Sequence, residues 1–149
     1  MISRILVPVD GSKTAKKAAE YAVELAKQLD ASIIIMSVIE KSQLIAETVP
    51  ASKTAMHTIE SIEDYLKEIA EMNIGEILKL CDKNHVVSEM SIKTGHPVKE
   101  ILKEAKRSKA NLIVMGSHGR SALSATILGS VSYGVIHNDT KIPILIVRG

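Results

Sequence analysis

Short runs with strand character alternate along this chain with segments of helical periodicity, and this alternation restricts the fold more than any other feature. Apolar runs of this length with little polar alternation are typical of strands buried on both faces. Parallel strands need long crossover connections, usually helices, which then cover both faces of the sheet. We therefore expect an α/β fold with a largely parallel, five-stranded sheet and right-handed crossovers, its strands at 4–9, 32–38, 85–94, 111–115 and 142–147.

The first helical segment follows Ser12, a residue type that caps helix starts. Alanines and leucines recur at helical spacing up to Asp30, which marks the exit into the second strand. Segment 40–55 has no clear period and is expected to be a long surface connection. Helical spacing returns from Met56, although Gly75 weakens it by about 1 kcal/mol relative to alanine, so the pattern allows one long helix or a broken one.

Two shorter helices are expected in the second half of the chain. The turn Gly95-His96-Pro97 places a proline at the first helical position, where its missing N–H does no harm. Residues 98–105 then show one apolar face, and residues 131–137 form a second short helical segment before the last strand.

Composition bounds the kind of protein. The chain has 149 residues, and we treat 1–149 as one domain. Lys and Arg number 19 and Asp and Glu 17, a net charge of +2 that argues against nucleic acid or an anionic membrane as partner. No apolar run approaches the roughly 20 residues that span a bilayer, and no signal-peptide pattern opens the chain. We expect a cytoplasmic protein in which the single cysteine, Cys81, is a buried hydrophobe.

The segment with chemical content follows the fourth expected strand. Gly116 and Gly119 allow the backbone to approach a ligand closely, and Gly129-Ser130 places free amides and hydroxyls at a helix start, where phosphate is favoured. A micromolar ligand requires about 8 kcal/mol, whereas a helix dipole contributes roughly 0.3 to 2 kcal/mol. Amides from both clusters, with the hydroxyls of Ser130 and Ser132, are therefore needed together.

Known catalytic nucleotide motifs are missing from this segment. The chain has neither Gly-x-x-x-x-Gly-Lys-Ser/Thr nor Gly-x-Gly-x-x-Gly after a strand, which argues against a P-loop NTPase or a Rossmann dehydrogenase. No lysine lies within the motif, and no second acid near it offers a base to position water. We expect binding with at most slow hydrolysis, not an efficient enzyme.

The complete pattern resembles the universal stress protein family. The spacing Gly116-x-x-Gly119, nine residues, then Gly129-Ser130 is similar to the family's nucleotide-binding signature. The opening Ile-Leu-Val-Pro-Val-Asp-Gly-Ser, the Gly95-His96-Pro97 turn and the terminal Pro143-Ile-Leu-Ile-Val also match, so the resemblance covers nearly the whole chain. It implies a Rossmann-like parallel sheet in the order 3-2-1-4-5, with ATP and Mg or Mn across the ends of strands one and four.

The resemblance also implies contact residues. Pro8, Val9 and Asp10 would border the adenosine, Asp10 contacting the ribose or the metal ion, and Val38 would offer backbone contacts to adenine. Ribose and phosphates would lie among residues of the two glycine clusters: Met115, Gly116, Ser117, His118, Gly119, Arg120, Gly129, Ser130, Val131 and Ser132.

For three of these side chains the sequence also allows a role that involves no ligand. Asp10 can equally cap the first helix or stabilise its turn. His118 can donate to phosphate or remain a solvated loop histidine whose backbone alone contacts ligand. Arg120 can neutralise phosphate or point to water.

Three functional hypotheses follow. The first is a nucleotide-responsive regulatory protein of the stress response, whose ligand-bound state is recognised by an unidentified partner protein. The second is a slow ATPase or phosphotransferase. The third is a nucleotide-free homodimer paired through the edge strand 144–147, and such pairing can also accompany the first. The sequence does not choose among ATP, AMP and a cyclic nucleotide.

Overall fold

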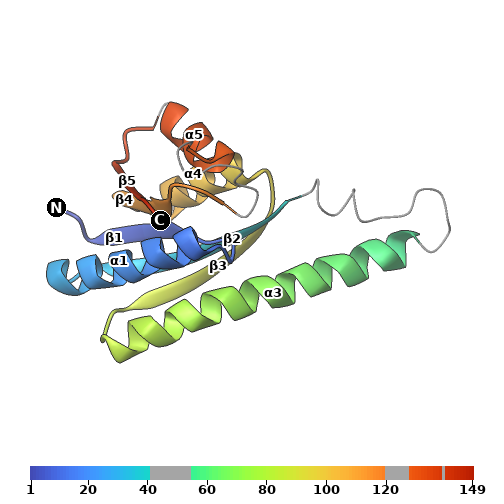
Figure 1. Ribbon diagram of the computed structural model, residues 1–149, viewed down its shortest axis with the longest axis horizontal. Helices are drawn as coiled ribbons and strands as arrows, with labels where there is room; N and C mark the ends of the chain where they lie inside the picture. The colour runs from blue at the N-terminus through green and yellow to red at the C-terminus, as the bar shows by residue number, and fades with distance from the viewer. Residues whose placement is uncertain (41–54, 120–127, 139) are drawn as a thin grey trace.

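The computed structural model describes residues 1–40, 55–119, 128–138 and 140–149 (Figure 1). Within them the chain forms one five-stranded sheet in the order β3-β2-β1-β4-β5, with every neighbouring pair parallel. This confirms the expected sheet and strand order. The strands are β1 (Arg4–Pro8), β2 (Ser32–Glu40), β3 (Ser88–Gly95), β4 (Leu112–Gly116) and β5 (Ile144–Val147).

Helices cover both faces of this sheet, as expected for parallel strands joined by crossovers. Helices α1 and α3 lie on one face, and α4 and α5 lie on the other (Figure 1). The helices are α1 (Lys13–Leu29), α3 (Ala55–Lys83), α4 (Pro97–Arg107) and α5 (Ser130–His137).

Some strand boundaries differ from the sequence-based expectation, and of the two forms expected for the second helix the structure has the unbroken one. Strand β3 begins at Ser88 and not at 85, because His85 adopts a left-handed φ of 58° that ends the preceding helical turn. Strand β5 begins at Ile144 and not at 142, after a turn in which the Ile142 amide donates to the Thr140 hydroxyl (3.2 Å). Helix α3 is unbroken through Gly75, which therefore lowers helix propensity without ending the helix.

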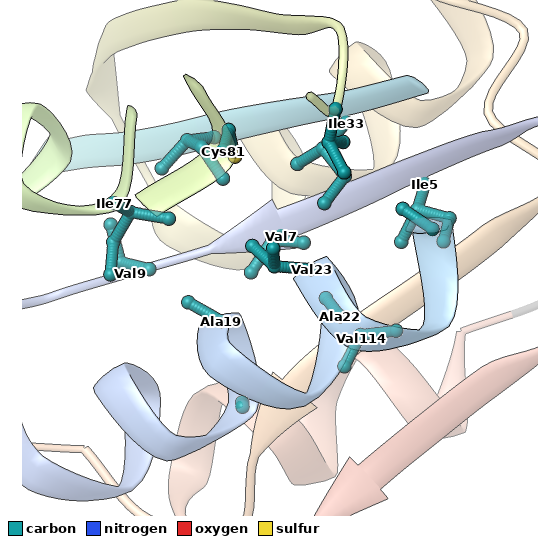
Figure 2. Packing of buried hydrophobic residues seen from close by; sticks show 14 of the residues in the cluster. Ile5, Val7, Val9, Ala19, Ala22, Val23, Ile33, Ile77, Cys81 and Val114 are labelled. Carbon is teal, nitrogen blue, oxygen red and sulfur yellow. The ribbon is translucent and has the colours of Figure 1, made fainter. Parts of the chain in front are cut away.

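Two hydrophobic clusters form the core, one on each face of the sheet. On the α1 and α3 side, Ile5, Val7 and Ile33 of the central strands are fully buried. Ala19, Ala22 and Val23 bring α1 down onto the sheet, and Ile77 and Cys81 do the same for α3 (Figure 2). Small residues on α1 allow the helix to approach closely. On the other face, the largest fully buried hydrophobic side chains are Leu6, Ile34, Met36, Ile101 and Ile113.

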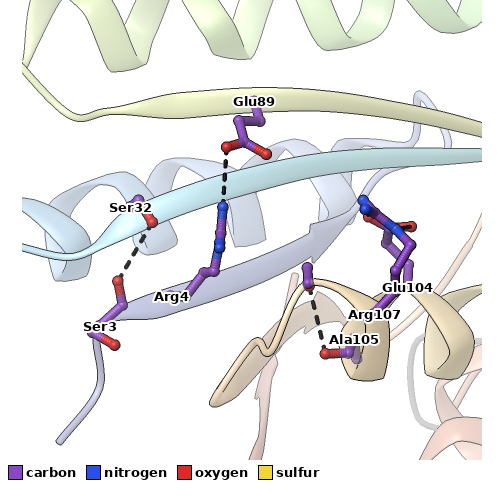
Figure 3. A network of polar contacts seen from close by, with 8 residues as sticks. Ser3, Arg4, Ser32, Glu89, Glu104, Ala105 and Arg107 are labelled. Atoms are coloured by element: carbon purple, nitrogen blue, oxygen red, sulfur yellow. Dashed lines mark hydrogen bonds and ion pairs between the residues drawn. The ribbon is translucent and has the colours of Figure 1, made fainter.

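The amino ends of the strands are tied together by side-chain hydrogen bonds. Asn111 Oδ1 accepts from the amides of Ser3 and Arg4, both at 3.0 Å, and Asn111 Nδ2 donates to the Met1 carbonyl at 2.9 Å. Arg4 Nη2 reaches across β2 to Glu89 Oε1 at 3.0 Å (Figure 3). At this end of the sheet, polar side chains bond to backbone groups and to one another.

A buried carboxylate lies on α4 near the same end. Glu104 is 2% exposed, and Arg107 on the next turn donates to both of its oxygens (Figure 3). These bonds from Arg107 hold the pKa of Glu104 below its ordinary value, although burial alone would raise it. Arg107 thus supplies the hydrogen bonds that the Glu104 carboxylate would otherwise make with water.

Candidate functional site

The carboxyl ends of β1 and β4 lie side by side at the point where the strand order reverses: β2 and β3 are added on one side of β1, and β4 and β5 on the other. Strand β1 pairs with β2 on one side and with β4 on the other, and the chain visits β2 first and β4 much later. In open parallel sheets ligands bind in the crevice outside the carboxyl ends of the strands at such a switch point. A ligand site is therefore expected among the residues that follow β1 and β4.

Asp10 follows β1 in a tight turn. Its Oδ1 accepts from the Ser12 amide at 2.9 Å, while Gly11 has φ of +84°, a conformation that favours glycine. Ser12 caps α1, its hydroxyl accepting from the Ala15 amide at 3.2 Å. One carboxylate oxygen of Asp10 thus stabilises the turn. The other, Oδ2, lies 2.8 Å from where a Cβ on Gly119 would be.

The backbone of the loop after β4 is fixed by hydrogen bonds with three other parts of the chain. The Ser117 amide donates to the Val147 carbonyl at 3.0 Å, and the Gly129 amide donates to the Ser117 carbonyl at 2.7 Å. The His118 carbonyl accepts from the Thr14 hydroxyl in the first turn of α1. Residues 116–119, the start of α1 and the start of α5 therefore form one small, connected region.

Two glycines make this close packing possible. A Cβ on Gly116 would lie 2.8 Å from the backbone carbonyl carbon of Thr14 and 3.0 Å from the Ala15 amide nitrogen. A Cβ on Gly129 would lie 3.2 Å from both the Cα of His118 and the carbonyl oxygen of Ser117. The sequence signature thus has a packing function in addition to any ligand function, because both glycines lie where backbone meets backbone.

The start of α5 supplies the second half of the region. Gly129 is the N-cap, Ser130 is exposed and Val131 is half-buried. Ser132 behaves differently from the expectation that its hydroxyl would reach phosphate. It is 3% exposed, and its hydroxyl donates to the Gly116 carbonyl at 2.8 Å. A hydroxyl has one proton to donate, so here Ser132 holds α5 to the end of β4.

His118 carries an unused polar atom. Its Nδ1 lies 2.6 Å from the hydroxyl oxygen of Ser117, whereas its Nε2 is buried and has no hydrogen-bond partner in the described part of the chain. Buried ring nitrogens are normally paired, so an unpaired one at a candidate site calls for an explanation.

The remaining residues that the sequence singled out divide into two groups. Val9 and Met115 are 7% and 4% exposed, so their side chains belong to the core and only their backbone borders the site. Pro8 is half-buried at the end of β1. Arg120 lies outside the described residues.

Val38 is placed where its backbone faces the site. The Met36 carbonyl accepts from the Val9 amide at 2.7 Å, so the backbone groups of Met36 point toward β1. Alternate residues of a parallel strand direct these groups to the same neighbour, and Val38 therefore points the same way. Because β1 ends at Pro8, which pairs with Met36, the backbone of Val38 lies beyond the end of β1.

A pocket of about 340 Å³ adjoins this region and includes residues that sequence reasoning missed. Glu40 at the end of β2 lines it together with the Gly95-His96-Pro97-Val98 turn, and Ser130 and Val131 complete it. Its volume is at the lower end of the range for small-molecule sites. The sequence of the Gly95-His96-Pro97 turn predicts a helix start, but no sequence pattern near it indicates that the turn lies opposite the start of α5.

Neither a metal cluster nor a membrane helix is found in the described ranges. No three His, Cys, Asp or Glu side chains within them come together as a metal-binding group. Across the same residues, no helix has the length and apolarity needed to cross a bilayer.

Comparison with known proteins decides the family. The model of the universal stress protein family matches residues 1–148. The chain belongs to the universal stress protein family. A relative in this family, universal stress protein MJ0531 of Methanocaldococcus jannaschii, is 32% identical over 148 residues, covering 99% of this chain and 83% of that protein.

Solved structures show the same family fold. MJ0577, a universal stress protein from the same organism, superimposes with a TM-score of 0.85 at 28% identity, covering 99% of this chain and 96% of the other. A universal stress protein solved in complex with cAMP has a TM-score of 0.69 at 22% identity, with coverage of 99% and 97%. At that identity the second likeness supports the fold alone.

Proposed function

We propose that this chain binds an adenine nucleotide, with ATP as the leading candidate, across the carboxyl ends of β1 and β4. One observation carries the proposal: the glycine loop 116–119, Asp10 and the start of α5 converge in one region in which His118 Nε2 has no partner among the described residues. An anionic ligand with several oxygens would supply a hydrogen-bond partner for a protonated Nε2 and would be favoured by the amides at the helix start.

The two parts of the region fit the two ends of a nucleotide. Phosphates would lie over the loop 117–119 and the exposed Ser130, near the positive end of α5. The base would lie toward the backbone of Val38 and the adjoining pocket, whose Pro97, Val98 and Val131 are aliphatic. This agrees with a chain that has no Phe or Trp to stack on a base.

A divalent ion fits this site only as a companion of the nucleotide. Asp10 is the acidic side chain that the geometry brings to the glycine loop, and one carboxylate is a weak site alone. Mg²⁺ in proteins is commonly held by one or two carboxylates together with substrate phosphates. We therefore propose that Asp10 and the nucleotide's own oxygens would share the ion, which would supply charge neutralisation.

The proposed role is regulatory. Nucleotide binding at residues 116–119 and 129–132 would set the state of this region, and a partner protein of the stress response would recognise that state. We also propose pairing of two copies through β5, because all four of its residues are half-exposed and it forms an open sheet edge. Both steps rest on family membership and on this exposed edge.

The first test is calorimetric titration of ATP with Mg²⁺ into the wild-type chain and into Gly119→Val. Any side chain at 119 displaces Asp10 from the loop, since a Cβ there lies 2.8 Å from Asp10 Oδ2, and we expect binding to fall at least tenfold. The matched control is Gly75→Val, because beyond its own neighbours and the surrounding backbone of α3 nothing lies within 4 Å of a Cβ at Gly75. Equal binding by all three proteins, or none by a folded wild type, would refute the proposal.

Competition between nucleotides then refines the ligand. ATP, AMP and cAMP share the base and differ in the number and geometry of their phosphates, so titrating each shows which phosphate arrangement the site prefers. A site built over loop and helix amides should prefer the ligand with the longer phosphate chain. A preference for cAMP would instead show that the site selects the compact cyclic phosphate over an extended phosphate chain.

A further inference from the structure

We infer that Ser117 is a positioning residue that holds the His118 ring with its proton on Nε2, so that the ring presents a hydrogen-bond donor to an anionic oxygen of the ligand. This deepens the proposed function and rests on it. The inference assigns the site a preference for ligands that carry phosphate over the corresponding nucleosides, and it attributes part of that preference to a hydroxyl that does not touch the ligand.

The two side chains are adjacent in a loop that has little freedom. Ser117 is 4% exposed, and its hydroxyl oxygen lies 2.6 Å from His118 Nδ1. The amide and the carbonyl of Ser117 are bonded to Val147 and Gly129, and the His118 carbonyl is bonded to Thr14. Because the backbone is fixed on both sides of the contact, the serine hydroxyl is held beside the ring.

Counting donors and acceptors selects the direction of this bond. A neutral imidazole carries one proton. If the proton is on Nε2, the Ser117 hydroxyl donates to Nδ1, and one buried group, the Nε2–H, has no partner among the described residues. If the proton is on Nδ1, the Nε2 lone pair has no partner and the Ser117 hydroxyl proton has no acceptor in the described part of the chain either. The first arrangement leaves fewer buried groups unpaired and is favoured.

The favoured arrangement determines what the ring can bind. A buried N–H without an acceptor is completed by a phosphate or hydroxyl oxygen and not by another donor. Protonation of the ring leaves this unchanged, because both nitrogens then carry a proton and the serine oxygen accepts from Nδ1. Nε2 is a donor in both states, so Ser117 removes the one state in which the ring would repel a phosphate oxygen.

The binding test compares ATP with adenosine in wild type and Ser117→Ala. Loss of the hydroxyl frees the ring to place its proton on either nitrogen, and we expect ATP affinity to fall roughly tenfold, the effect of about one hydrogen bond to a charged group. Adenosine affinity should change little. An equal loss for both ligands, or no loss for ATP, would overturn the inference.

A second variant separates positioning from a general structural role. Glutamine can carry an N–H donor on its side-chain amide without help from Ser117, so His118→Gln should retain much of the ATP affinity. In that background Ser117→Ala should have no further effect on ATP binding. If Ser117→Ala costs the same factor in the His118→Gln variant as in the wild type, the serine acts through the loop and the inference is wrong.

The ring proton can also be located without any nucleotide. Nitrogen NMR of labelled chain distinguishes a protonated Nε2 from a protonated Nδ1, and we expect Nε2 to carry the proton in wild type and a mixture in Ser117→Ala. A proton on Nδ1 in wild type overturns the inference even if ATP binds. If wild type binds no nucleotide, the proposed function fails by the titration, and the spectrum still decides which ring nitrogen carries the proton beside Ser117.

Discussion

The two ends of the same parallel strands are built on opposite principles. At the amino ends, the Asn111 side chain bonds to Met1, to Arg4 and, through two separate atoms, to Ser3. At the carboxyl ends, glycines at 116, 119 and 129 allow close approach, and at 116 and 129 backbone meets backbone. The amino ends are joined mainly through the polar side chain of Asn111, whereas the carboxyl ends combine side-chain hydrogen bonds with close backbone packing at glycines.

The two ends also differ in which buried polar groups lack a hydrogen-bond partner within the described residues. At the amino ends the buried Arg4 Nε has no partner there, yet the same guanidinium is anchored to Glu89 through Nη2. At the carboxyl ends the unpaired atom, His118 Nε2, belongs to a ring whose other nitrogen is already engaged. An unpaired group at a switch point between strands is positioned to meet a ligand, whereas the amino ends serve the fold. Substitutions at the two ends should therefore separate stability from binding.

Gly116→Ala should have the largest effect, because it disturbs both properties. The new Cβ would lie 2.8 to 3.0 Å from backbone atoms of Thr14 and Ala15. Backbone atoms in a helix cannot rotate away as a side chain can, so β4 and α1 must move apart. We expect a loss of about 1–3 kcal/mol in the free energy of unfolding, the usual cost of overpacking, together with loss of ATP binding. Urea unfolding and calorimetry measure the two. Unchanged stability would show that the contact is not as rigid as described.

Asn111→Ala should affect stability alone. It leaves the amides of Ser3 and Arg4 without their acceptor, and water replaces it in part because the site is partly exposed. We expect a loss of about 1–2 kcal/mol in the free energy of unfolding, with ATP affinity unchanged. A drop in ATP affinity equal to that of Gly116→Ala would contradict the separation of the two ends.

Glu104→Gln should show the smallest effect and one that depends on pH. The folded-state pKa of Glu104 is lowered, first by its hydrogen bonds from Arg107. Its contribution to stability is therefore fully present above the ordinary value of 4.5 and is lost as the pH falls through the lower folded-state pKa. The stability difference between wild type and Glu104→Gln should shrink from pH 7 toward acid. The control, Glu89→Gln, removes an exposed pair and should change stability little at any pH.

The fold was largely predictable because its signals are local. Buried strands read as apolar runs, and the alanine face of α1 read as a helix that packs closely, so element order and the parallel sheet followed. The order 3-2-1-4-5 came from the family resemblance, since periodicity does not say which side of β1 receives β4. Strand starts were less accurate, because the left-handed turn at His85 has no distinctive local signal.

The site was predictable in its glycines and less so in its hydroxyls and its pocket. Glycine spacing reports close approach, but it does not say what is approached, and for Gly116 the neighbour is α1. Ser132 read as a phosphate donor, yet its proton goes to the Gly116 carbonyl, a contact set by tertiary packing. Glu40 and His96 join the pocket from separate strand ends, a juxtaposition that no local pattern encodes.

The burial of Cys81 has a consequence for how such a protein could sense its surroundings. The side chain is 0% exposed on the face of α3 that packs on the sheet, and burial raises the pKa of the thiol, which disfavours the reactive thiolate. It is the chain's single cysteine, so no disulfide partner exists within the chain either. An oxidant would reach this sulfur only after the end of α3 had opened. A response of the folded protein to oxidants would therefore need a chemical group other than this thiol.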